Sequence, residues 1–291
     1  MAKVKIITDS SCDIPRHYKD ELNIGICPLS VTIDGVTYRE WYDITASEFM
    51  KKLVEAKEFP KTALAGPELF LDEYRKAEQE GYETAIVVTI AAVSSGTYQS
   101  ARIAAEMFAD EGGKCEIIVY DSNKLSFGYG VMVIGAGEYA KEGRSKEEII
   151  ERMEYLSRHS EIYFGVDTLE YLKKGGRINA VKAAVGTMLD LKPILSLKGG
   201  KVEQLETVRG SKKVYSTIIQ RLKDNRGEKP YDKVYFAFSG DDSKMKKLME
   251  KYFEEFGECE YEIFELGVVV GAHAGPGVTA VFVINPEFEA E

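Results

Sequence analysis

Short apolar runs alternate with helical segments in the first half of this chain, and this alternation limits the possible folds more than any other feature. Residues 4–8, 84–90 and 115–120 are strand-like runs, and each is followed by a polar turn and a helical segment. Strands that alternate with helices pair in parallel and have helices on both faces of the sheet. We therefore predict an N-terminal α/β/α domain with a parallel sheet.

The pattern changes near residue 160, where a strand at residues 162–166 is followed by a hairpin at residues 193–202. The later segments alternate again: helices at residues 211–223 and 242–256, and strands at residues 233–238, 260–265 and 279–284. A chain of 291 residues fits two domains better than one. We predict an N-terminal α/β domain (residues 1–159) and a C-terminal α/β domain with a mixed sheet (residues 160–291).

The charge and cysteine content narrow the expected partners and the cell compartment. The chain has 38 Lys and Arg residues against 48 Asp and Glu residues, a net charge of −10 that repels a phosphate backbone, so we expect no nucleic acid partner. The four cysteines, Cys12, Cys27, Cys115 and Cys259, lie far apart, as expected of reduced thiols in the cytoplasm. No apolar run reaches the roughly 18 residues of a membrane span, so we expect no stable membrane anchoring.

Several catalytic motifs are absent from the sequence. It contains no G-x-x-x-x-G-K-[ST], no G-x-G-x-x-G, no H-E-x-x-H and no G-x-S-x-G motif. Nucleotide hydrolysis, dinucleotide redox chemistry, zinc protease activity and α/β-hydrolase activity therefore lose their usual sequence support. The histidines, His17, His159 and His273, are widely separated, and we expect neither a metal site nor a cofactor.

Hydroxyl side chains gather where three predicted strands end: Thr8, Ser10 and Ser11, then Ser94, Ser95 and Thr97, then Ser122. In an open parallel sheet these ends face a common crevice, where ligands bind. Ser95-Gly96-Thr97 also precedes a predicted helix, whose free N–H groups and dipole favour an anion. Two interpretations stay open: the turns converge on a carboxylate or phosphate, or the hydroxyls only cap helices.

His273 and Arg177 are further candidates. We interpret residues 271–277, which are rich in Gly and Ala, as a flexible loop in which His273 can donate a hydrogen bond to an anion or titrate near neutrality. Arg177 follows two glycines at a predicted helix end, and its guanidinium can bind a carboxylate or phosphate through two donors. The alternative for Arg177 is a contact with the last carbonyls of that helix on a solvated turn.

Local signals predict further elements. Asp13, shortly before Pro15, predicts a helix cap, and residues 59–67 are predicted to be a loop. Thr45 and Glu48 have the spacing of a capping box.

Four glycines fall in the predicted helix of residues 125–140: Gly128, Gly130, Gly135 and Gly137. So many glycines weaken a helix, which predicts that it is buried and closely packed.

The chain resembles the DegV family, in order and over nearly its whole length. The resemblance rests on Thr8-Asp9-Ser10-Ser11-Cys12-Asp13-Ile14-Pro15, Ser95-Gly96-Thr97-Tyr98-Gln99-Ser100-Ala101, Asp121-Ser122, Asp167-Thr168-Leu169-Glu170-Tyr171-Leu172-Lys173-Lys174-Gly175-Gly176-Arg177-Ile178, Lys192-Pro193-Ile194-Leu195 and Gly275-Pro276-Gly277. It implies a bacterial two-domain α/β protein that holds a long-chain fatty acid, such as palmitate, in a tunnel between its domains. It also implies a partner, the catalytic subunit of fatty acid kinase, which phosphorylates the carboxyl group that the DegV-type subunit presents.

The resemblance also assigns site residues. The positions that hold the fatty acid carboxylate fall on Thr62, Ser95 with Gly96, and His273, and Arg177 falls on the side of the acyl phosphate or the partner. Two segments depart from the family pattern. Thr62-Ala63-Leu64-Ala65-Gly66-Pro67 stands where the family usually has Thr-Ser-Gln-Pro-Ser-Pro, and Ala91-Ala92-Val93-Ser94-Ser95-Gly96 stands where it usually has Ser-Ser-Gly-Leu-Ser-Gly.

Three functions from different classes follow. The leading hypothesis is a non-catalytic carrier that buries an acyl chain and fixes its carboxylate. The alternative is a serine-dependent hydrolase or acyltransferase with Ser95 as nucleophile and His273 as base, for which the sequence supplies no evident orienting acid. The third is a structural or regulatory module without a ligand.

Overall fold

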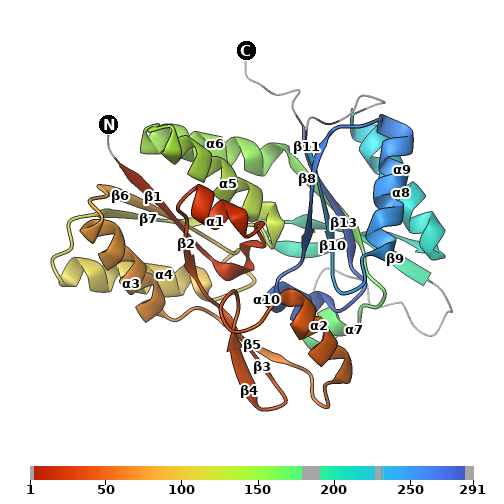
Figure 1. Cartoon of the computed structure of the whole chain (residues 1–291), viewed down its shortest axis with the longest axis horizontal. Coiled ribbons are helices and arrows are strands. Elements are labelled where there is room, and N and C mark those ends of the chain that lie inside the picture. Colours follow the sequence, from red (N-terminus) through yellow and green to blue (C-terminus); the bar gives the residue numbers. More distant parts are fainter. Residues whose placement is uncertain (1–2, 179–190, 227–230, 232, 286–291) are drawn as a thin grey trace. The chain divides into compact units, whose positions relative to one another are not determined.

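The computed structural model describes residues 3–178, 191–226, 231 and 233–285. The chain forms two compact units (Figure 1): one contains Met1–Ile44 and Lys61–Arg158, and the other contains Thr45–Pro60 and His159–Glu291. We call them the N-terminal and the C-terminal unit. The stretch Thr45–Pro60 thus groups with the C-terminal part of the chain, and the linear division into domains at residues 159 and 160 stays a prediction.

The N-terminal unit is built on a parallel sheet with the strand order β2-β1-β6-β7, as expected. Its strands are β1 (Val4–Asp9), β2 (Gly25–Cys27), β6 (Thr84–Thr89) and β7 (Glu116–Asp121). Every residue of β1 and β6 is buried, which is typical of central strands covered on both faces. Because the strands are parallel and Thr89 pairs with Asp121, the turns that follow β6 and β7 leave the sheet at the same edge.

The N-terminal unit also contains helices. They are η1 (Ser10–Cys12), α1 (His17–Glu21), α3 (Pro67–Gln79), α4 (Thr97–Asp110), α5 (Phe127–Lys141) and α6 (Lys146–His159). Of these, α3, α4 and α5 pack on the sheet. Helices α3 and α4 pack against each other, and α5 packs on β1 and β6 (Figure 1). The expected close packing of α5 is present: a Cβ on Gly130 would lie 2.3 Å from the Cys12 carbonyl oxygen, and one on Gly135 would lie 2.3 Å from Leu156 Cδ1.

The predicted cap at Asp13 is wrong. Asp13 has a left-handed backbone, with φ of 53°, and its carboxylate accepts a hydrogen bond from Ser126 Oγ. Asp9 caps the first turn instead, because its side chain accepts from Ser11 N, and α1 begins only at His17 without a side-chain cap. Asp13 thus ends the first turn and does not start α1, and its carboxylate binds a serine that is distant in the sequence.

A small antiparallel sheet, with the order β4-β3-β5, completes the N-terminal unit. Its strands are β3 (Ser30–Ile33), β4 (Val36–Arg39) and β5 (Lys61–Ala63). The prediction of a loop over residues 59–67 is therefore wrong for β5. This short segment is a strand because it pairs with β3, about thirty residues earlier, and its own sequence carries no strand pattern.

The C-terminal unit contains a mixed sheet of six strands with the order β10-β9-β8-β13-β11-β12, in which β11 and β12 are parallel. The strands are β8 (Ser160–Gly165), β9 (Leu191–Lys198), β10 (Lys201–Arg209), β11 (Lys233–Phe238), β12 (Glu260–Glu265) and β13 (Thr279–Ile284). The helices are α2 (Ala46–Glu55), α7 (Glu170–Lys174), α8 (Ser211–Arg226), α9 (Ser243–Phe256) and α10 (Val268–Ala274). Helix α2 begins with the predicted capping box of Thr45 and Glu48.

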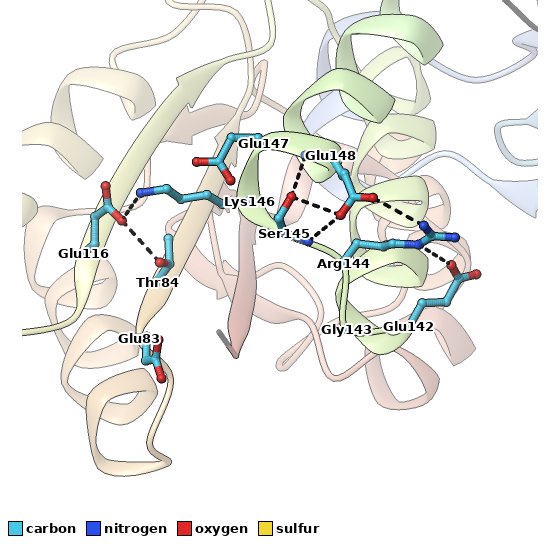
Figure 2. Close-up of a pocket in the computed structure, with 10 residues that line it drawn as sticks. All are labelled: Glu83, Thr84, Glu116, Glu142, Gly143, Arg144, Ser145, Lys146, Glu147 and Glu148. Carbon is cyan, nitrogen blue, oxygen red and sulfur yellow. Dashed lines mark hydrogen bonds and ion pairs between the residues drawn. The ribbon is translucent and has the colours of Figure 1, made fainter. Parts of the chain in front are cut away.

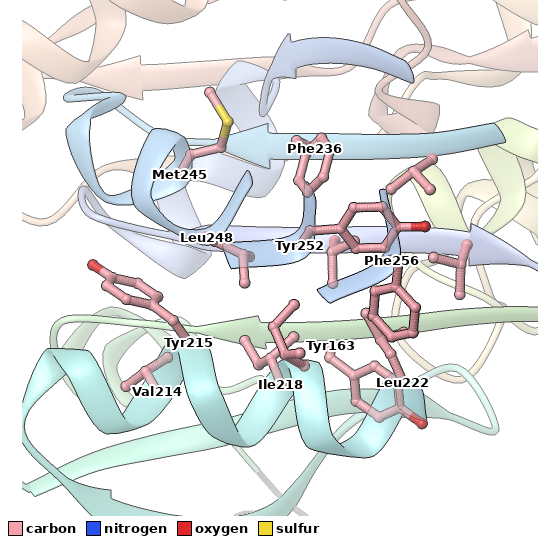
Figure 3. Close-up of a cluster of buried hydrophobic side chains, with 14 of the residues drawn as sticks. Tyr163, Val214, Tyr215, Ile218, Leu222, Phe236, Met245, Leu248, Tyr252 and Phe256 are labelled. Carbon is pink, nitrogen blue, oxygen red and sulfur yellow. The ribbon is translucent and has the colours of Figure 1, made fainter. Parts of the chain in front are cut away.

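Helices α8 and α9 enclose an apolar core against the sheet of the C-terminal unit (Figure 3). Phe236 of β11 is fully buried, and its ring centroid lies 5.7 Å from that of Tyr252 on α9 in an edge-to-face arrangement. Ile218 and Leu222 of α8 are also fully buried in this cluster. Strand β11 is packed into this core through Phe236, and Ser239, just past its carboxyl end, contacts the turn that follows α10.

The described residues include neither a membrane-spanning helix nor a cluster of metal-ligating side chains. None of the helices in this part of the chain is both long and apolar enough to cross a membrane. Nor do the described residues include a group of three or more His, Cys, Asp or Glu side chains that could hold a metal ion. The four cysteines are free thiols.

Candidate functional site

The turn that contains Ser95 joins β6 to α4. It is tightened by two backbone hydrogen bonds, from Ser94 N (2.9 Å) and Ser95 N (3.1 Å) to the Ala91 carbonyl. Ser95 Oγ accepts from Thr97 N (3.3 Å) and lies 2.9 Å from Thr97 Oγ1. Ser95 is partly exposed and Gly96 is exposed, so solvent reaches the first turn of α4. A hydroxyl beside the N–H groups of a helix N-terminus is suited to an anion.

The segment that follows Thr62 lies against this turn. Thr62 is in β5, where it pairs with Val31, and the chain continues through Leu64 to Ala65. Ser100 Oγ of α4 donates to the Ala65 carbonyl (2.6 Å), and a Cβ on Gly96 would lie 2.9 Å from Leu64 Cδ2. The N-terminal unit thus brings the Thr62 and Ser95 segments together. In the segment that departs from the family pattern, an apolar side chain lies over Gly96.

The other hydroxyls at this edge of the sheet have structural roles. Ser10 is fully buried, donates to Glu40 Oε2 (2.5 Å) and accepts from Leu29 N (2.9 Å). Ser11 is also fully buried and donates to Asp9 Oδ1. Ser122 is buried and accepts from Lys124 N (3.1 Å). Of the three predicted turns, only the one with Ser95 keeps its hydroxyl partly exposed.

Arg177 is placed by the end of helix α7. Gly176 has a φ of 71°, a left-handed conformation that glycine adopts without strain. Arg177 N then donates to the Leu172 carbonyl (2.9 Å) and Gly176 N to the Lys173 carbonyl (3.1 Å), which is the Schellman arrangement. The exposed guanidinium donates through Nη1 to the Gly175 carbonyl (2.6 Å). The predicted contact with a carbonyl at the helix end is therefore present, on an exposed side chain.

His273 lies on helix α10 and not in a loop, so the expected flexible loop is wrong for this residue. The helix spans Val268–Ala274, and the left-handed Gly275 follows it directly. The imidazole packs on the turn that precedes Arg177: a Cβ on Gly175 would lie 2.2 Å from His273 Nδ1. The C-terminal unit thus brings Arg177 and His273 together through a glycine.

Burial and the neighbouring Arg177 guanidinium change the protonation of His273. Burial, as the larger cause, and the positive charge of Arg177 lower the pKa of His273 to about 4. The imidazole is consequently neutral near pH 7, and one of its nitrogens carries a proton that it can donate. The predicted titration of His273 near neutrality is wrong, because the sequence does not reveal its burial.

Further glycines allow α2, α7 and α10 to approach one another closely. A Cβ on Gly275 would lie 2.3 Å from the Tyr171 ring of α7, and one on Gly271 would lie 2.2 Å from Met50 Cε of α2. The Tyr171 ring in turn lies 6.1 Å from that of Phe59. Small residues at these contacts let helix α10, which carries His273, pack against helix α7, which ends shortly before Arg177.

Ser239, which the sequence reasoning missed, fixes the turn after α10. It lies just past β11, is fully buried, and donates from Oγ to the Gly275 carbonyl (2.6 Å). The same oxygen accepts from Val278 N (3.0 Å), and the Ser239 carbonyl accepts from Gly277 N (2.9 Å). Ser239 carries the signal that picked out Ser95, a hydroxyl just beyond a predicted strand.

A charged groove lies at the opposite edge of the N-terminal sheet, where β6 and β7 begin (Figure 2). It has a volume of about 740 Å³ and is lined by Glu83, Thr84, Glu116, Glu142, Gly143, Arg144, Ser145, Lys146, Glu147 and Glu148. Lys146 pairs with Glu116 (2.6 Å), and Arg144 pairs with Glu142 (3.2 Å) and Glu148 (3.3 Å). Such a charged lining does not suit an acyl chain.

The chain is similar in sequence to proteins of one family over nearly its whole length. Residues 3–286 match the model of a family described as "Uncharacterised protein, DegV family". A DegV domain-containing protein from Listeria innocua is 32% identical over 275 residues, which is 94% of this chain and 96% of the relative. One from Clostridium acetobutylicum is 34% identical over 288 residues, covering 98% and 99% of the two chains.

Solved structures of similar fold include fatty-acid-binding proteins. A DegV family protein from Thermus thermophilus, described for its fatty acid binding, has a TM-score of 0.88 and 35% identity over 97% of this chain and 99% of its own. A stearic-acid-binding protein from Eubacterium ventriosum has a TM-score of 0.87 and 28% identity, with 98% of each chain covered. The two-unit α/β fold is therefore shared with proteins that bind fatty acids.

The lowered pKa of His273 has a measurable consequence. We expect its imidazole resonances, followed by NMR between pH 8 and pH 4, to stay in the neutral form until the pH approaches about 4. An unfolded histidine binds its proton near pH 6.5, so the stabilisation from neutral His273 is complete above that pH and is lost as the pH falls towards 4. Arg177→Ala should raise the pKa of His273 and leave it below 6.5, because burial is the larger cause. Titration of wild-type His273 at or above pH 6.5 would contradict this assignment.

Proposed function

This chain belongs to the DegV family, and on that premise we propose that it is a non-catalytic carrier of a long-chain fatty acid such as palmitate. The observation that supports this most is the close structural match, over nearly the whole chain, to DegV proteins that bind fatty acids. Each buried CH₂ group contributes about 0.8 kcal/mol. A sixteen-carbon chain would therefore supply most of the affinity, and the polar end would set the orientation.

We assign the carboxylate to the groups described above. In the N-terminal unit, Thr62, Ser95 and the backbone of Gly96 would donate hydrogen bonds to it. In the C-terminal unit, His273 would donate an N–H as a neutral imidazole, and Arg177 would supply positive charge. Hydrogen bonds to an ionised group are stronger than those between neutral groups, which suits a carboxylate held by few donors.

The acyl chain requires apolar surface. Phe164, Tyr235 and Phe282 each neighbour a core residue along their strand, so their side chains lie on the other face of the C-terminal sheet, where they are buried. Phe264 of β12 is buried as well. The rings of Phe264 and Phe282 lie 5.9 Å apart. We assign part of the chain's lining to these residues. The location of the chain between the two domains stays a prediction.

The second part of the proposal is presentation to a kinase. A carboxylate oxygen of the bound fatty acid would attack the γ-phosphorus of ATP held by a separate catalytic subunit. A bond from that oxygen to phosphorus forms, the bond from phosphorus to the bridging oxygen breaks, and ADP leaves with acyl phosphate as the product. Arg177 is suited to offset the charge that this transfer places beside it, because it is exposed and permanently cationic.

The serine hydrolase alternative has less support. Within the described part of the chain, the hydrogen bonds of Ser95 Oγ are to Thr97, in the arrangement of a turn-capping hydroxyl. A nucleophilic serine is usually activated by a base that a third group orients. The carrier function explains the turn without that requirement.

We expect the purified protein to retain a fatty acid from its expression host in a near-stoichiometric amount, because an empty apolar tunnel would forfeit transfer energy and packing contacts. Organic extraction and mass spectrometry measure the retained lipid. Absence of extracted lipid, together with no uptake of added palmitate, would refute the carrier function.

Ser95→Ala should weaken palmitate binding roughly tenfold or more without abolishing it, since one hydrogen bond to a charged group contributes about 1.5–3 kcal/mol. Ser216→Ala, on the exposed surface of α8, is the matched control.

Arg177→Ala and His273→Ala should separate carrying from presentation. We expect both variants to retain lipid and to support much slower acyl phosphate formation with ATP and a fatty acid kinase catalytic subunit of the same host. The reason is that the positive charge of Arg177 and the N–H of neutral His273 stabilise the charge that develops in the transition state more than they stabilise the ground state. Lys174→Ala removes a neighbouring charge that is already paired with Glu170 (2.6 Å) and should retain the wild-type rate. A wild-type protein that carries lipid and supports no phosphorylation would refute only the kinase part. Ester hydrolysis by the protein alone, lost in Ser95→Ala, would establish the enzyme instead.

A further inference from the structure

The strand-end acids Asp9 and Asp121 are not used by the proposed function, and both contact the loop that leads to Ser95. Asp9 ends β1 and is fully buried, and Asp121 ends β7 and is partly buried. The loop between β6 and α4 runs from Ile90 to Gly96. What holds this loop decides where the Ser95 hydroxyl and the first turn of α4 are placed.

Three consecutive backbone amides at the start of this loop each have an acceptor from a different place. Ile90 N donates to Asp9 Oδ2 (2.9 Å). Ala91 N donates to the Lys124 carbonyl (2.9 Å). Ala92 N donates to Asp121 Oδ1 (3.1 Å). The Ala91 carbonyl then accepts from Ser94 N and Ser95 N, so the anchored residue is directly bonded to the Ser95 turn.

The Asp9 acceptor is itself held by other segments. Its Oδ1 accepts from Ser11 N (3.1 Å), Ser11 Oγ (2.5 Å) and Tyr129 Oη of α5 (2.7 Å). Burial raises the pKa of Asp9, and these hydrogen bonds act in the opposite direction by favouring the ionised form. The carboxylate therefore links the end of β1, helix α5 and the Ser95 loop.

The Asp121 acceptor makes a compact turn of its own. The same Oδ1 that accepts from Ala92 N also accepts from Asn123 N (3.0 Å). Ser122 closes the next bond by accepting from Lys124 N, and the Lys124 carbonyl is the acceptor for Ala91 N. The turn after β7 thus presents two acceptors, one side chain and one carbonyl, to adjacent amides of the Ser95 loop.

We propose that Asp9 and Asp121 are positioning residues, which hold the Ile90–Ala92 amides so that the Ser95 turn keeps the geometry needed to bind a carboxylate. This inference rests on the proposed function for its ligand. The part of the inference that concerns the geometry of the loop depends only on these hydrogen bonds. It predicts that Asp121 acts as a hydrogen-bond acceptor and not as a charge.

Asp121 offers a test in which acceptor and charge have opposite effects. Asp121→Asn keeps Oδ1 as an acceptor for both amides and removes the negative charge, and Asp121→Ala removes both. If charge were the important property, either change would tighten the binding of an anionic ligand, because like charges repel. If position is the important property, Asp121→Ala weakens binding and Asp121→Asn restores it.

We expect Asp121→Ala to weaken palmitate binding about fivefold, the factor that one net hydrogen bond represents, and Asp121→Asn to stay within about twofold of wild type. Hydrogen exchange in the absence of lipid should be faster for the Ala92–Ser95 amides in Asp121→Ala and unchanged in Asp121→Asn. Asp9→Asn, which cannot offer acceptors to both Ile90 N and Ser11 N, should accelerate exchange at one of these amides.

The outcomes separate the inference from the function on which it rests. If wild type binds no palmitate and Asp121→Ala still accelerates exchange, the carrier function fails and the positioning role of Asp121 stands for the loop. If palmitate binds and Asp121→Ala leaves both exchange and affinity unchanged, or tightens binding, the positioning role is refuted. Equal weakening by Asp121→Ala and Asp121→Asn would also refute it, because the acceptor would then be irrelevant.

Discussion

The N-terminal unit depends most on the hydrogen bonds of the Asp9 carboxylate, because this side chain is the acceptor for buried donors from three parts of the chain. An unpaired buried N–H costs about as much as a lost hydrogen bond, and the Ile90 amide at the end of β6 has Asp9 as its acceptor. Ser11 and Tyr129 bind the same side chain. A parallel sheet brings its strand ends to one edge, and Asp9 joins two of those ends there.

The C-terminal unit depends on steric contact at glycines. Arg177 and His273 are brought together because Gly175 has no side chain to separate them, and Tyr171 reaches α10 because Gly275 leaves room. The left-handed Gly176 sets the direction in which the chain leaves α7. The same packing buries His273 and keeps it neutral near pH 7, which makes it a hydrogen-bond donor beside a permanent cation.

Much of the fold followed from the sequence, because buried parallel strands, capping boxes and a glycine-rich buried helix have local signals. The errors share one physical cause. Asp13 binds the distant Ser126 and ends a turn where a helix cap was expected. Residues 61–63 form a strand because β3 pairs with them, and His273 is helical and packs on Gly175 where a Gly-rich sequence indicated a loop. In each case a partner distant in sequence decides the local structure. Ser239 was missed although it carried the same strand-end signal as Ser95.

The central claim is that an ionised fatty acid carboxylate is held by hydrogen-bond donors of this protein. The most direct measurement is the ¹³C NMR resonance of palmitate labelled at its carboxyl carbon, bound to the protein and followed as a function of pH. Donors to the charged form lower a carboxyl pKa, so the bound resonance should stay at its ionised position from pH 8 to about pH 5 and should move when Ser95 is replaced by Ala. A bound carboxyl group that takes up its proton above about pH 6, and whose resonance does not shift in Ser95→Ala, would contradict the claim.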